Sequence, residues 1–450
     1  MSDFKKIGVG FLVALVVFLL SLILFTTTQS MLLGSIALLV VMWTNEALPL
    51  AIVSLLPIVL FPSLGILGTK ATAINYSHPI IYLFLGGFML AIAVEKTNLH
   101  RFIADKMLSL FPNTPKGMIF SLALTSALLS SILSNTTTTL LLISIALFIT
   151  EDKALKMRFA LAIAYGASVG GIMTPIGTPP NLILLGIMND KGMEAIPFFQ
   201  WIWMVLPLAF LMLLAVSFLL SLGVDKNKIH RDTQHKSLDI QQKKVLYLMG
   251  ALMALLFVNA PIKPFWSGLG LSDAGILLGA GLILFMPPFK VLEWEGDSVK
   301  IPYKIIFLFG AGFSIAKAFG ATGLADKVAT YLINMTHITP LLLLFSVALL
   351  ITFTTEITSN TALISIMLPV IYSVAKQTSI DTTLFMMVAT LCASYAFMLP
   401  IATPPNAIAM SSGVVDVKDM IKYGIVLNIV GIFLIVMIAE FFWKGVFLSS

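Results

Sequence analysis

Long apolar stretches separated by short polar segments extend along almost the whole chain of 450 residues. A helix needs ~20 predominantly apolar residues to cross the hydrocarbon core of a bilayer. Runs that approach or exceed this length begin at Ile7, Met31, Ile80, Phe159, Trp201, Val245, Ala274, Ile305, Leu384 and Ile425. The first run is too long for the apolar core of a signal peptide, and no small-residue cleavage site follows it, so we expect a retained span. The pattern predicts an all-α polytopic membrane protein.

Two polar motifs interrupt the apolar runs, and each occurs twice. Ser134-Asn135-Thr136 recurs as Ser359-Asn360-Thr361, and Pro-Ile-Gly-Thr-Pro-Pro-Asn at 175–181 recurs as Pro-Ile-Ala-Thr-Pro-Pro-Asn at 400–406. In both cases the second copy lies 225 positions after the first, and the same offset aligns Leu83-Phe84 with Leu308-Phe309 and Thr114-Pro115 with Thr339-Pro340. The chain therefore contains one unit twice, as in secondary transporters whose site lies between two repeats near the middle of the bilayer.

The sequence around each Ser-Asn-Thr predicts a re-entrant hairpin. Apolar arms at 117–133 and 137–150 flank the first tripeptide, and arms at 340–353 and 362–375 flank the second. Each arm is short for a complete crossing. Non-helical backbone is tolerated at membrane depth only where protein or a water-filled cavity covers it. We therefore expect hairpins near 117–150 and 340–375, with buried and functional tips.

The residue types in these motifs suit an anion and a hard cation together. Ser and Thr hydroxyls and Asn amides offer donors to a carboxylate and oxygens to a cation without carrying charge. The prolines of Thr-Pro-Pro interrupt a helix, which frees carbonyl oxygens and leaves the N-terminus of a half-helix facing an anion. A single such motif would be explained more simply by a kink or by packing of small residues. Two pairs in register favour a binding site.

Composition and charge define the organisation of the chain. Hydrophobic residues make up 59% and charged residues 11%, whereas soluble domains carry about 25% charged residues. The net charge of +6 is concentrated in 223–244, with Lys226, Lys228, Arg231, Lys236, Lys243 and Lys244, and at the N-terminus. Basic loops lie on the cytoplasmic side, so 223–244 is predicted to be a cytoplasmic linker between membrane halves 1–222 and 245–450, with a cytoplasmic N-terminus. Acidic residues interrupt this basic segment, which argues against nucleic-acid binding.

Other classes of function find little support in the sequence. An enzyme is disfavoured because the chain has no His-Glu-x-x-His motif, no paired intramembrane aspartates and no Cys-His arrangement. The single cysteine, Cys392, excludes an internal disulfide and a Cys-based metal site. An anion channel is disfavoured because nothing resembles a ring-forming selectivity filter. No cofactor is expected apart from coupling ions.

The doubled Ser-Asn-Thr, with the downstream Gly/Ala-Thr-Pro-Pro-Asn, resembles the divalent anion:sodium symporters, whose bacterial members include sodium-dependent dicarboxylate transporters. The resemblance covers nearly the whole chain. It implies about eleven transmembrane helices plus the two hairpins, inverted repeats, and a transport domain that moves against a scaffold as an elevator. It also implies a homodimer in the inner (cytoplasmic) membrane that takes up C4-dicarboxylates such as succinate, malate or fumarate with sodium. A sodium-independent dicarboxylate exchanger and a sodium symporter for citrate or sulfate remain alternatives.

The resemblance also assigns residues to sites. It puts one sodium ion on Ser130, Ser134, Asn135 and the Gly177 backbone, and a second on Thr355, Thr358, Asn360 and Ala402. It puts the dicarboxylate against Ser134, Asn135, Thr136, Ser359, Asn360 and Thr361, with Thr178, Pro179, Thr403 and Pro404 closing the site.

Glu356 is the only carboxylate near either tip. An intramembrane acid raises the possibility of proton coupling. We favour a structural carboxylate that accepts hydrogen bonds, because the residue at the corresponding position of the first repeat is Ser131. His78, His100 and His337 flank loops and are expected to be solvated.

Overall fold

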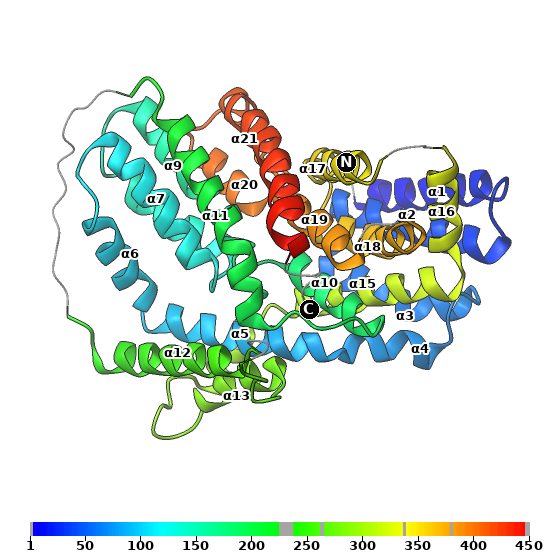
Figure 1. The fold of residues 1–450 in the computed structure, drawn as a ribbon, viewed down its shortest axis with the longest axis horizontal. Helices are drawn as coiled ribbons and strands as arrows, with labels where there is room; N and C mark the ends of the chain where they lie inside the picture. Colours follow the sequence, from blue (N-terminus) through cyan, green and yellow to red (C-terminus); the bar gives the residue numbers. More distant parts are fainter. Residues whose placement is uncertain (1–2, 225–236, 262–264, 336–338, 379–380, 446–450) are drawn as a thin grey trace.

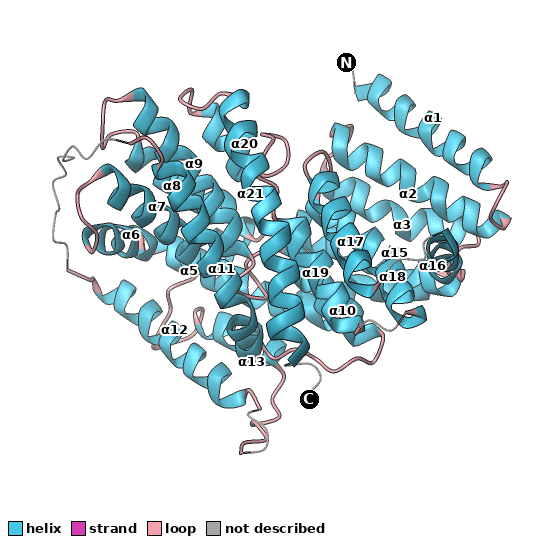
Figure 2. Cartoon of the chain, turned by 45° about the horizontal axis from the view of Figure 1, so that its top comes forward, coloured by secondary structure: helices cyan, strands magenta, loops and turns pink. Residues whose placement is uncertain are grey.

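The computed structural model describes the chain apart from residues 1–2, 225–236, 262–264, 336–338, 379–380 and 446–450. The described residues form helices joined by loops, and no strand occurs among them (Figure 2). The first half comprises α1 (Asp3–Ser21), α2 (Thr27–Asn45), α3 (Leu50–Ser63), α4 (Thr69–Ala73), η1 (Ile74–Ser77), α5 (Pro79–Lys96), α6 (Leu99–Ser109), α7 (Pro115–Ser130), α8 (Asn135–Ala146), α9 (Lys153–Gly171), α10 (Pro179–Asp190) and α11 (Phe198–Ser221). The second half comprises α12 (Ile240–Asn259), α13 (Asp273–Ile283), α14 (Trp294–Asp297), η2 (Ser298–Lys300), α15 (Tyr303–Ala321), α16 (Leu324–Met335), α17 (Pro340–Thr355), α18 (Asn360–Gln377), α19 (Thr382–Ser394), α20 (Pro404–Ser411), α21 (Val417–Ile438) and η3 (Ala439–Trp443).

Six helices in the described part of the chain are long and apolar enough to cross a membrane. They are Asp3–Ser21, Thr27–Asn45, Thr69–Lys96, Phe198–Ser221, Tyr303–Ala321 and Val417–Trp443. Several shorter apolar helices accompany them, among them α3, α8, α13, α17 and α19. Large apolar side chains such as Phe11, Leu19 and Phe218 are exposed on the outside of the chain. A hydrocarbon surround is the medium in which such a surface is stable, so the fold is that of a multi-pass membrane protein.

The two Ser-Asn-Thr motifs each join a pair of helices end to end. Thr114 caps α7 by accepting from the Gly117 N–H, and Ser134 caps α8 by accepting from the Thr137 N–H. The second repeat reproduces both caps, since Thr339 accepts from the Leu342 N–H and Ser359 from the Ala362 N–H. Hydroxyl caps of this kind satisfy N–H groups that a helix start leaves unpaired. In both halves, therefore, two short helices meet at a Ser-Asn-Thr tripeptide.

The helices form two clusters on opposite sides of the molecule. One half-helix of each repeat packs against helices of the other repeat. In Figures 1 and 2, α6 to α9 and α11 lie on one side, and α1 to α3 with α15 to α18 lie on the other. Helix α10 follows the broken segment of the first repeat but packs against α15, α18 and α19 of the second. Helix α20, its counterpart, packs against α8 and α9 of the first repeat. This exchange interlocks the halves through the helices that begin at the two Thr-Pro-Pro-Asn motifs.

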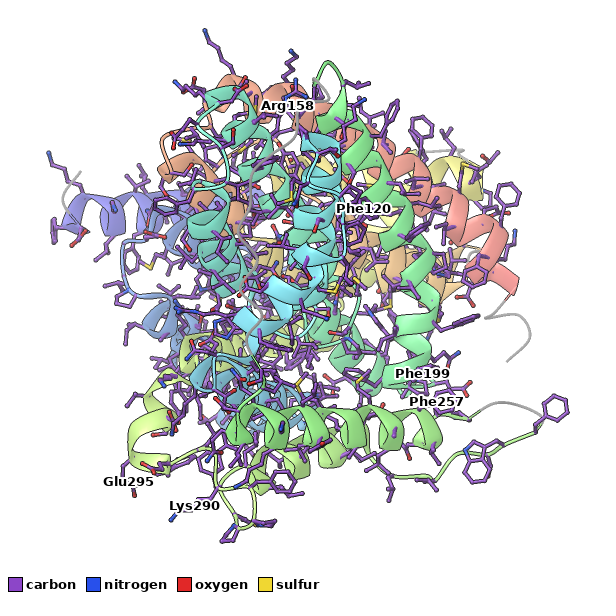
Figure 3. The ribbon with its side chains drawn as sticks, turned by 90° about the vertical axis from the view of Figure 1, so that its left-hand side faces the viewer. Phe120, Arg158, Phe199, Phe257, Lys290 and Glu295 are labelled. Atoms are coloured by element: carbon purple, nitrogen blue, oxygen red, sulfur yellow. The ribbon has the colours of Figure 1, made fainter. Side chains whose placement is uncertain are left out.

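Polar and aromatic contacts hold the first cluster together and join α12 to it. On one side, Arg158 of α9 donates to the carbonyl oxygens of Leu220 and Leu222 at the end of α11. Phe199 of α11 meets Phe257 of α12 edge to face with ring centroids 4.7 Å apart (Figure 3). A cation at a helix C-terminus complements the helix dipole, so Arg158 stabilises the end of α11.

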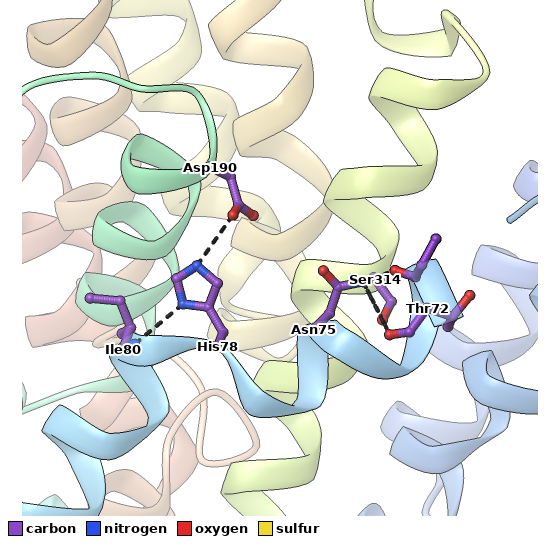
Figure 4. A network of polar contacts seen from close by, with 7 residues as sticks. Thr72, Asn75, His78, Ile80, Asp190 and Ser314 are labelled. Carbon is purple, nitrogen blue, oxygen red and sulfur yellow. Dashed lines mark hydrogen bonds and ion pairs between the residues drawn. The ribbon is translucent and has the colours of Figure 1, made fainter. Parts of the chain in front are cut away.

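On the other side, His78 and its neighbours join α5 to α10 and α15 (Figure 4). The Nδ1 atom of His78 accepts from the Ile80 N–H at 3.3 Å, and its Nε2 atom lies 3.3 Å from Asp190 Oδ1 at the end of α10. The ring packs against Phe313 of α15, with centroids 4.4 Å apart. His78 and His100 are both buried, so the expectation of solvated histidines is wrong for these two, and His337 lies outside the described residues. His78 is buried although it lies near a loop, because it caps α5 and pairs with Asp190 of α10.

Asp297 holds the C-terminal end of α5 against α14. Its carboxylate accepts from Lys96 Nζ at 2.7 Å, from Lys300 Nζ at 3.0 Å and from the Glu293 N–H at 2.9 Å. Burial of this carboxyl opposes ionisation, but the hydrogen bonds from Lys96, the Glu293 amide and Lys300 outweigh it and lower the pKa of Asp297 to about 2. The carboxylate is therefore charged at all ordinary pH values.

Close contact of α7 with α9 depends on two glycines of α9. A Cβ atom at Gly166 would collide with the Ala123 carbonyl group, and one at Gly170 with that of Ala127. The helix-packing role that the Gly166-x-x-x-Gly170 spacing indicates is thus confirmed. The same segment also matches Gly-x-Ser-x-Gly, but Ser168 lies inside a helix instead of at the strand-to-helix turn that a hydrolase nucleophile requires.

The same spacing, Gly275-x-x-x-Gly279 in α13, would predict another packing face, and that prediction is wrong. A Cβ atom at Gly279 would meet nothing within 4 Å, and one at Gly275 only the Ser272 side chain at 3.8 Å. Helix α13 meets α5 instead at Leu277, whose carbonyl lies against Gly86, and at Gly281, which lies next to Gly86 and Met89. Spacing alone does not distinguish which face of a helix meets its neighbour.

We predict that Gly170→Ala destabilises the protein by about 1–3 kcal/mol, because a methyl group has no room beside Ala127. Gly279→Ala is the matched control, since it adds the same methyl group to a helix at an open position. The control should be neutral or slightly stabilising because alanine favours helices over glycine. Thermal unfolding of the purified proteins in detergent measures both effects, and equal midpoints for the two variants would contradict the packing role.

Candidate functional site

The first tip is organised around the side chain of Asn135. Ser130 Oγ, at the end of α7, donates to Asn135 Oδ1 at 2.6 Å. A Cβ atom at Gly171 would lie 3.1 Å from both the Oδ1 and Nδ2 atoms of Asn135 and 3.4 Å from the Thr178 Cβ. Glycine at 171 therefore lets the end of α9 approach the amide closely. Asn135 and Thr178, which the family resemblance assigns to the site, lie together beside this glycine, and Ser130 is bonded to Asn135.

The second tip has the same central hydrogen bond. Thr355 Oγ1 lies 2.6 Å from Asn360 Oδ1, and 2.8 Å from the Ala393 carbonyl oxygen of α19. Thr355 and Asn360 occupy the positions of Ser130 and Asn135 in the repeat. In both halves a hydroxyl group at the end of one helix fixes the amide that begins the next. The repeat is therefore one of hydrogen bonds as well as of sequence.

The tips differ from expectation in their burial. In the single chain Ser134 and Thr136 are exposed and Asn135, Ser359 and Asn360 are half-buried, whereas Thr361 is buried. The prediction of buried tips is thus wrong for the first tripeptide. Ser134 Oγ bonds within its own helix, accepting from the Thr137 N–H at 3.1 Å and donating to the Thr137 hydroxyl at 2.9 Å.

The helices of both Thr-Pro-Pro-Asn motifs break in the same way. Helix α9 ends at Gly171 and α10 begins at Pro179, with a turn between them in which the Gly177 N–H donates to the Thr174 carbonyl at 3.3 Å. In the second repeat the Ala402 N–H donates to the Leu399 carbonyl at 3.2 Å. Thr178 and Thr403 are buried, Pro404 is exposed, and Pro179 and Gly177 are half-buried. The N-termini of α10 and α20 thus carry the positive ends of their dipoles at these breaks.

Glu356 secures the second break. Its Oε1 atom accepts from the Met398 N–H at 2.9 Å and from Asn428 Nδ2 of α21 at 2.6 Å, and its Oε2 atom accepts from the Leu399 N–H at 2.9 Å. The side chain is buried. The predicted acceptance of backbone hydrogen bonds by Glu356 is confirmed.

The first repeat forms the equivalent connection without an acid. Thr174 Oγ1 donates to the carbonyl oxygen of Ser131, and these residues occupy the positions of Leu399 and Glu356 in the repeat. Both repeats therefore tie the same two positions together, through a hydroxyl in the first and a carboxylate in the second. Thr174 and Asn428 belong to the site's support, and sequence reasoning missed them because neither lies in a repeated motif.

The structure brings part of each predicted set together, namely Asn135, Gly177 and Thr178 around Gly171 in the first repeat and Thr355 with Asn360 in the second. Hydrogen bonds join Ser130 to Asn135 and Thr355 to Asn360, whereas none among the described residues joins the first set to the second. The link between the sets is the exchange of α10 and α20. The donors and oxygens present can bind anions and hard cations, and the described residues hold no cluster of His, Cys, Asp and Glu suited to a transition metal.

A family model for citrate transporters (CitMHS) matches residues 38–390. The sodium-dependent dicarboxylate transporter SdcS of Staphylococcus saprophyticus is 29% identical, over 97% of this chain and 92% of its own length. The Na(+)/dicarboxylate cotransporter 3 of Mus musculus is 31% identical, over 89% of this chain and 86% of its own.

Two solved structures are similar in fold. The YdaH transporter of Alcanivorax borkumensis has a TM-score of 0.61 at 14% identity, covering 84% of this chain and 89% of its own. MtrF of Neisseria gonorrhoeae, described as an antimetabolite efflux pump, has a TM-score of 0.58 at 13% identity, with 82% of each chain covered. At these identities the likeness concerns the fold alone.

Fold and relatives together define the chain as a membrane transporter and not an enzyme. It belongs to the citrate transporter family, and the resemblance to the divalent anion:sodium symporters that its motifs carry is confirmed.

We predict that Glu356→Ala lowers the free energy of unfolding by about 3 kcal/mol or more, because two backbone N–H groups and the Asn428 amide lose their buried acceptor. Glu151→Ala is the control, since the Glu151 side chain is 95% exposed and its ion pair with Lys156 contributes little. Thermal unfolding in detergent compares the two variants. Equal stability of Glu356→Ala and the parent protein would remove Glu356 from this structural role.

Proposed function

We propose that the protein is a secondary active transporter that couples sodium entry to uptake of C4-dicarboxylates, of the succinate, malate and fumarate class, across the cytoplasmic membrane. The observation that carries the proposal is the pair of matched, uncharged tips. In each, a hydroxyl holds Oδ1 of an asparagine at 2.6 Å. Relatives named as sodium-dependent dicarboxylate transporters support the same substrate and ion.

The substrate carboxylates would each meet one tip. In both tips the hydroxyl occupies Oδ1, which leaves the Nδ2 donors of Asn135 and Asn360 for a carboxylate. Serine and threonine hydroxyls and the N-termini of α10 and α20 add donors. The proposed substrate contacts are Ser134, Asn135, Thr136, Thr178, Pro179, Ser359, Asn360, Thr361, Thr403 and Pro404.

Sodium would supply the charge that the motifs lack. Neither tripeptide and neither break contains Lys, Arg or His, and bringing charge to the bilayer midplane costs a few kcal/mol per charge. The half-helices α10 and α20 contribute roughly half a positive charge each, which offsets about one of the two substrate charges. The proposed sodium ligands are Ser130, Ser134, Asn135 and Gly177 in the first half, and Thr355, Thr358, Asn360 and Ala402 in the second.

The remaining features of the proposal follow from the family resemblance. They are about eleven membrane crossings with two re-entrant hairpins, inverted repeats, an elevator movement of a transport domain against a scaffold, and a homodimer. The N-terminus and the linker 223–244 would be cytoplasmic, and residues 225–236 of that linker lie outside the described residues.

Citrate is a second candidate substrate, because the matching family model is described as a citrate transporter. A third carboxylate would require a donor beyond the two tips. Competition between citrate and succinate in one assay distinguishes the candidates.

The function is tested by uptake of labelled succinate into proteoliposomes that contain the purified protein. We expect uptake to require an inward sodium gradient and to fall at least tenfold when choline replaces sodium, because the dianion then lacks its counter-charge. Empty liposomes are the control, and unlabelled malate, fumarate, citrate and sulfate serve as competitors. Equal uptake in choline, driven only by internal succinate, would replace symport by sodium-independent exchange.

We further predict that Asn135→Ala and Asn360→Ala each abolish uptake while the protein remains folded. Each amide is proposed to serve substrate and sodium together, so its loss should cost on the order of several kcal/mol. Asn189→Ala, at an exposed position near the end of α10, is the control and should transport normally. Near-normal uptake by either tip variant, with a normal profile in size-exclusion chromatography, would remove that tip from the site.

A further inference from the structure

Asn181 and Asn406, the last residues of the two Thr-Pro-Pro-Asn motifs, form matched sets of hydrogen bonds. Asn181 Nδ2 donates to the carbonyl oxygens of Gly171 at 3.2 Å and Thr174 at 2.9 Å. Asn406 Nδ2 donates to those of Ala396 and Leu399, both at 3.0 Å. Every residue of the second set lies 225 positions after its counterpart. Both asparagines are fully buried, and neither enters the substrate or sodium contacts assigned above.

These bonds replace donors that the prolines remove. In a continuous helix the carbonyl of residue 171 would accept from the N–H of residue 175, and that of 396 from the N–H of 400. Residues 175 and 400 are both proline, which has no N–H to donate. The side-chain amide of Asn181 or Asn406, reaching back from the next half-helix, takes over this role in each repeat.

The orientation of each amide follows from its partners. Both acceptors are carbonyl oxygens, so Nδ2 must face them, and a flipped amide would place oxygen against oxygen. The Oδ1 atoms of Asn181 and Asn406 are then buried without a hydrogen-bond partner in the described part of the chain. In both repeats the oxygen of this amide therefore makes no hydrogen bond. The two bonds that Nδ2 donates are then the structural reason for an asparagine at this position.

The backbone held in this way touches the proposed sodium site. Gly171, whose carbonyl Asn181 binds, lies against the amide of Asn135, and its backbone is in close contact with Gly177. Thr174, the second partner, closes the turn that contains Gly177. In the second repeat Leu399 closes the turn that contains Ala402. Displacing either asparagine would therefore move the backbone that carries Gly177 or Ala402.

We propose that Asn181 and Asn406 are positioning residues for the two sodium sites, each fixing the broken backbone that supplies a sodium ligand. The inference rests on the proposed sodium coupling. It assigns the asparagines no direct contact with substrate or ion. Since sodium coordination tolerates only small changes in ligand position, loss of the amide donors should weaken sodium binding and change ion selectivity before it changes substrate recognition.

The test replaces each asparagine by the isosteric acid, which keeps the shape but removes both donors: Asn181→Asp and Asn406→Asp. Succinate uptake into proteoliposomes is measured against sodium concentration, with lithium as a second ion. We expect the half-saturating sodium concentration to rise at least tenfold in both variants and the ratio of lithium- to sodium-driven uptake to change. At saturating sodium, the half-saturating succinate concentration should change less than threefold. Asn189→Asp, at an exposed position of α10, should leave all three values unchanged.

The possible outcomes separate this inference from the proposed function. Sodium-independent uptake by the parent protein would overturn both. Sodium-dependent uptake by the parent, with unchanged sodium activation in both folded variants, would overturn the positioning role alone. If the acid variants do not give monodisperse protein, Asn181→Ala and Asn406→Ala are measured instead, together with the shift in melting temperature that sodium chloride produces over choline chloride. Failure of all four variants to fold would assign the asparagines to folding and overturn the inference.

Discussion

The need to pair every backbone polar group away from water governs this structure. A bilayer offers no water to an interrupted helix, so each break must find donors and acceptors within the protein. Pro175 and Pro400 remove the donors that would have served Gly171 and Ala396, and the amides of Asn181 and Asn406 replace them. The hydroxyl caps of Ser134 and Ser359 meet the same need where α7 turns into α8 and α17 into α18. Polar side chains therefore occur where helices are interrupted, and the interruptions are also where a ligand could meet unpaired groups.

The two repeats join the same positions at these breaks, although the residues that form the joints differ. Position 131 is joined to 174 by a threonine hydroxyl on a carbonyl, whereas the corresponding positions 356 and 399 are joined by a carboxylate on an N–H. The second joint also binds Asn428 and so connects α17 to α21. The same backbone break is thus held by different hydrogen-bonding groups in the two repeats, and in both the same two positions are joined.

Much of the local structure could be predicted from the sequence, because each motif acts within a few residues. The Thr-Pro helix starts, the Ser caps at positions 134 and 359 and the breaks before Pro179 and Pro404 are all encoded locally. The exchange of α10 and α20 between repeats could not be predicted, because partner choice depends on surfaces far apart in the chain. The prediction that His78 is solvated failed for the same reason, because His78 pairs with Asp190, which lies 112 positions away in the chain. Asn181 and Asn406 lie within the repeated motif, but the sequence alone does not separate their role from that of the neighbouring prolines. Only their hydrogen bonds do so.

A site built from neutral groups has a consequence for coupling. A fixed lysine or arginine would hold a carboxylate in the absence of any other ion, and binding would then be independent of sodium. In a site whose only fixed positive charge comes from helix ends, the substrate and the cation each stabilise the other. Linkage makes this effect reciprocal, so a dicarboxylate must raise the affinity for sodium by the factor by which sodium raises the affinity for dicarboxylate. In the proposed mechanism the absence of charge at the two tips is the property that makes the substrate depend on sodium, and the amides proposed to position the sodium ligands would set how strong this coupling is.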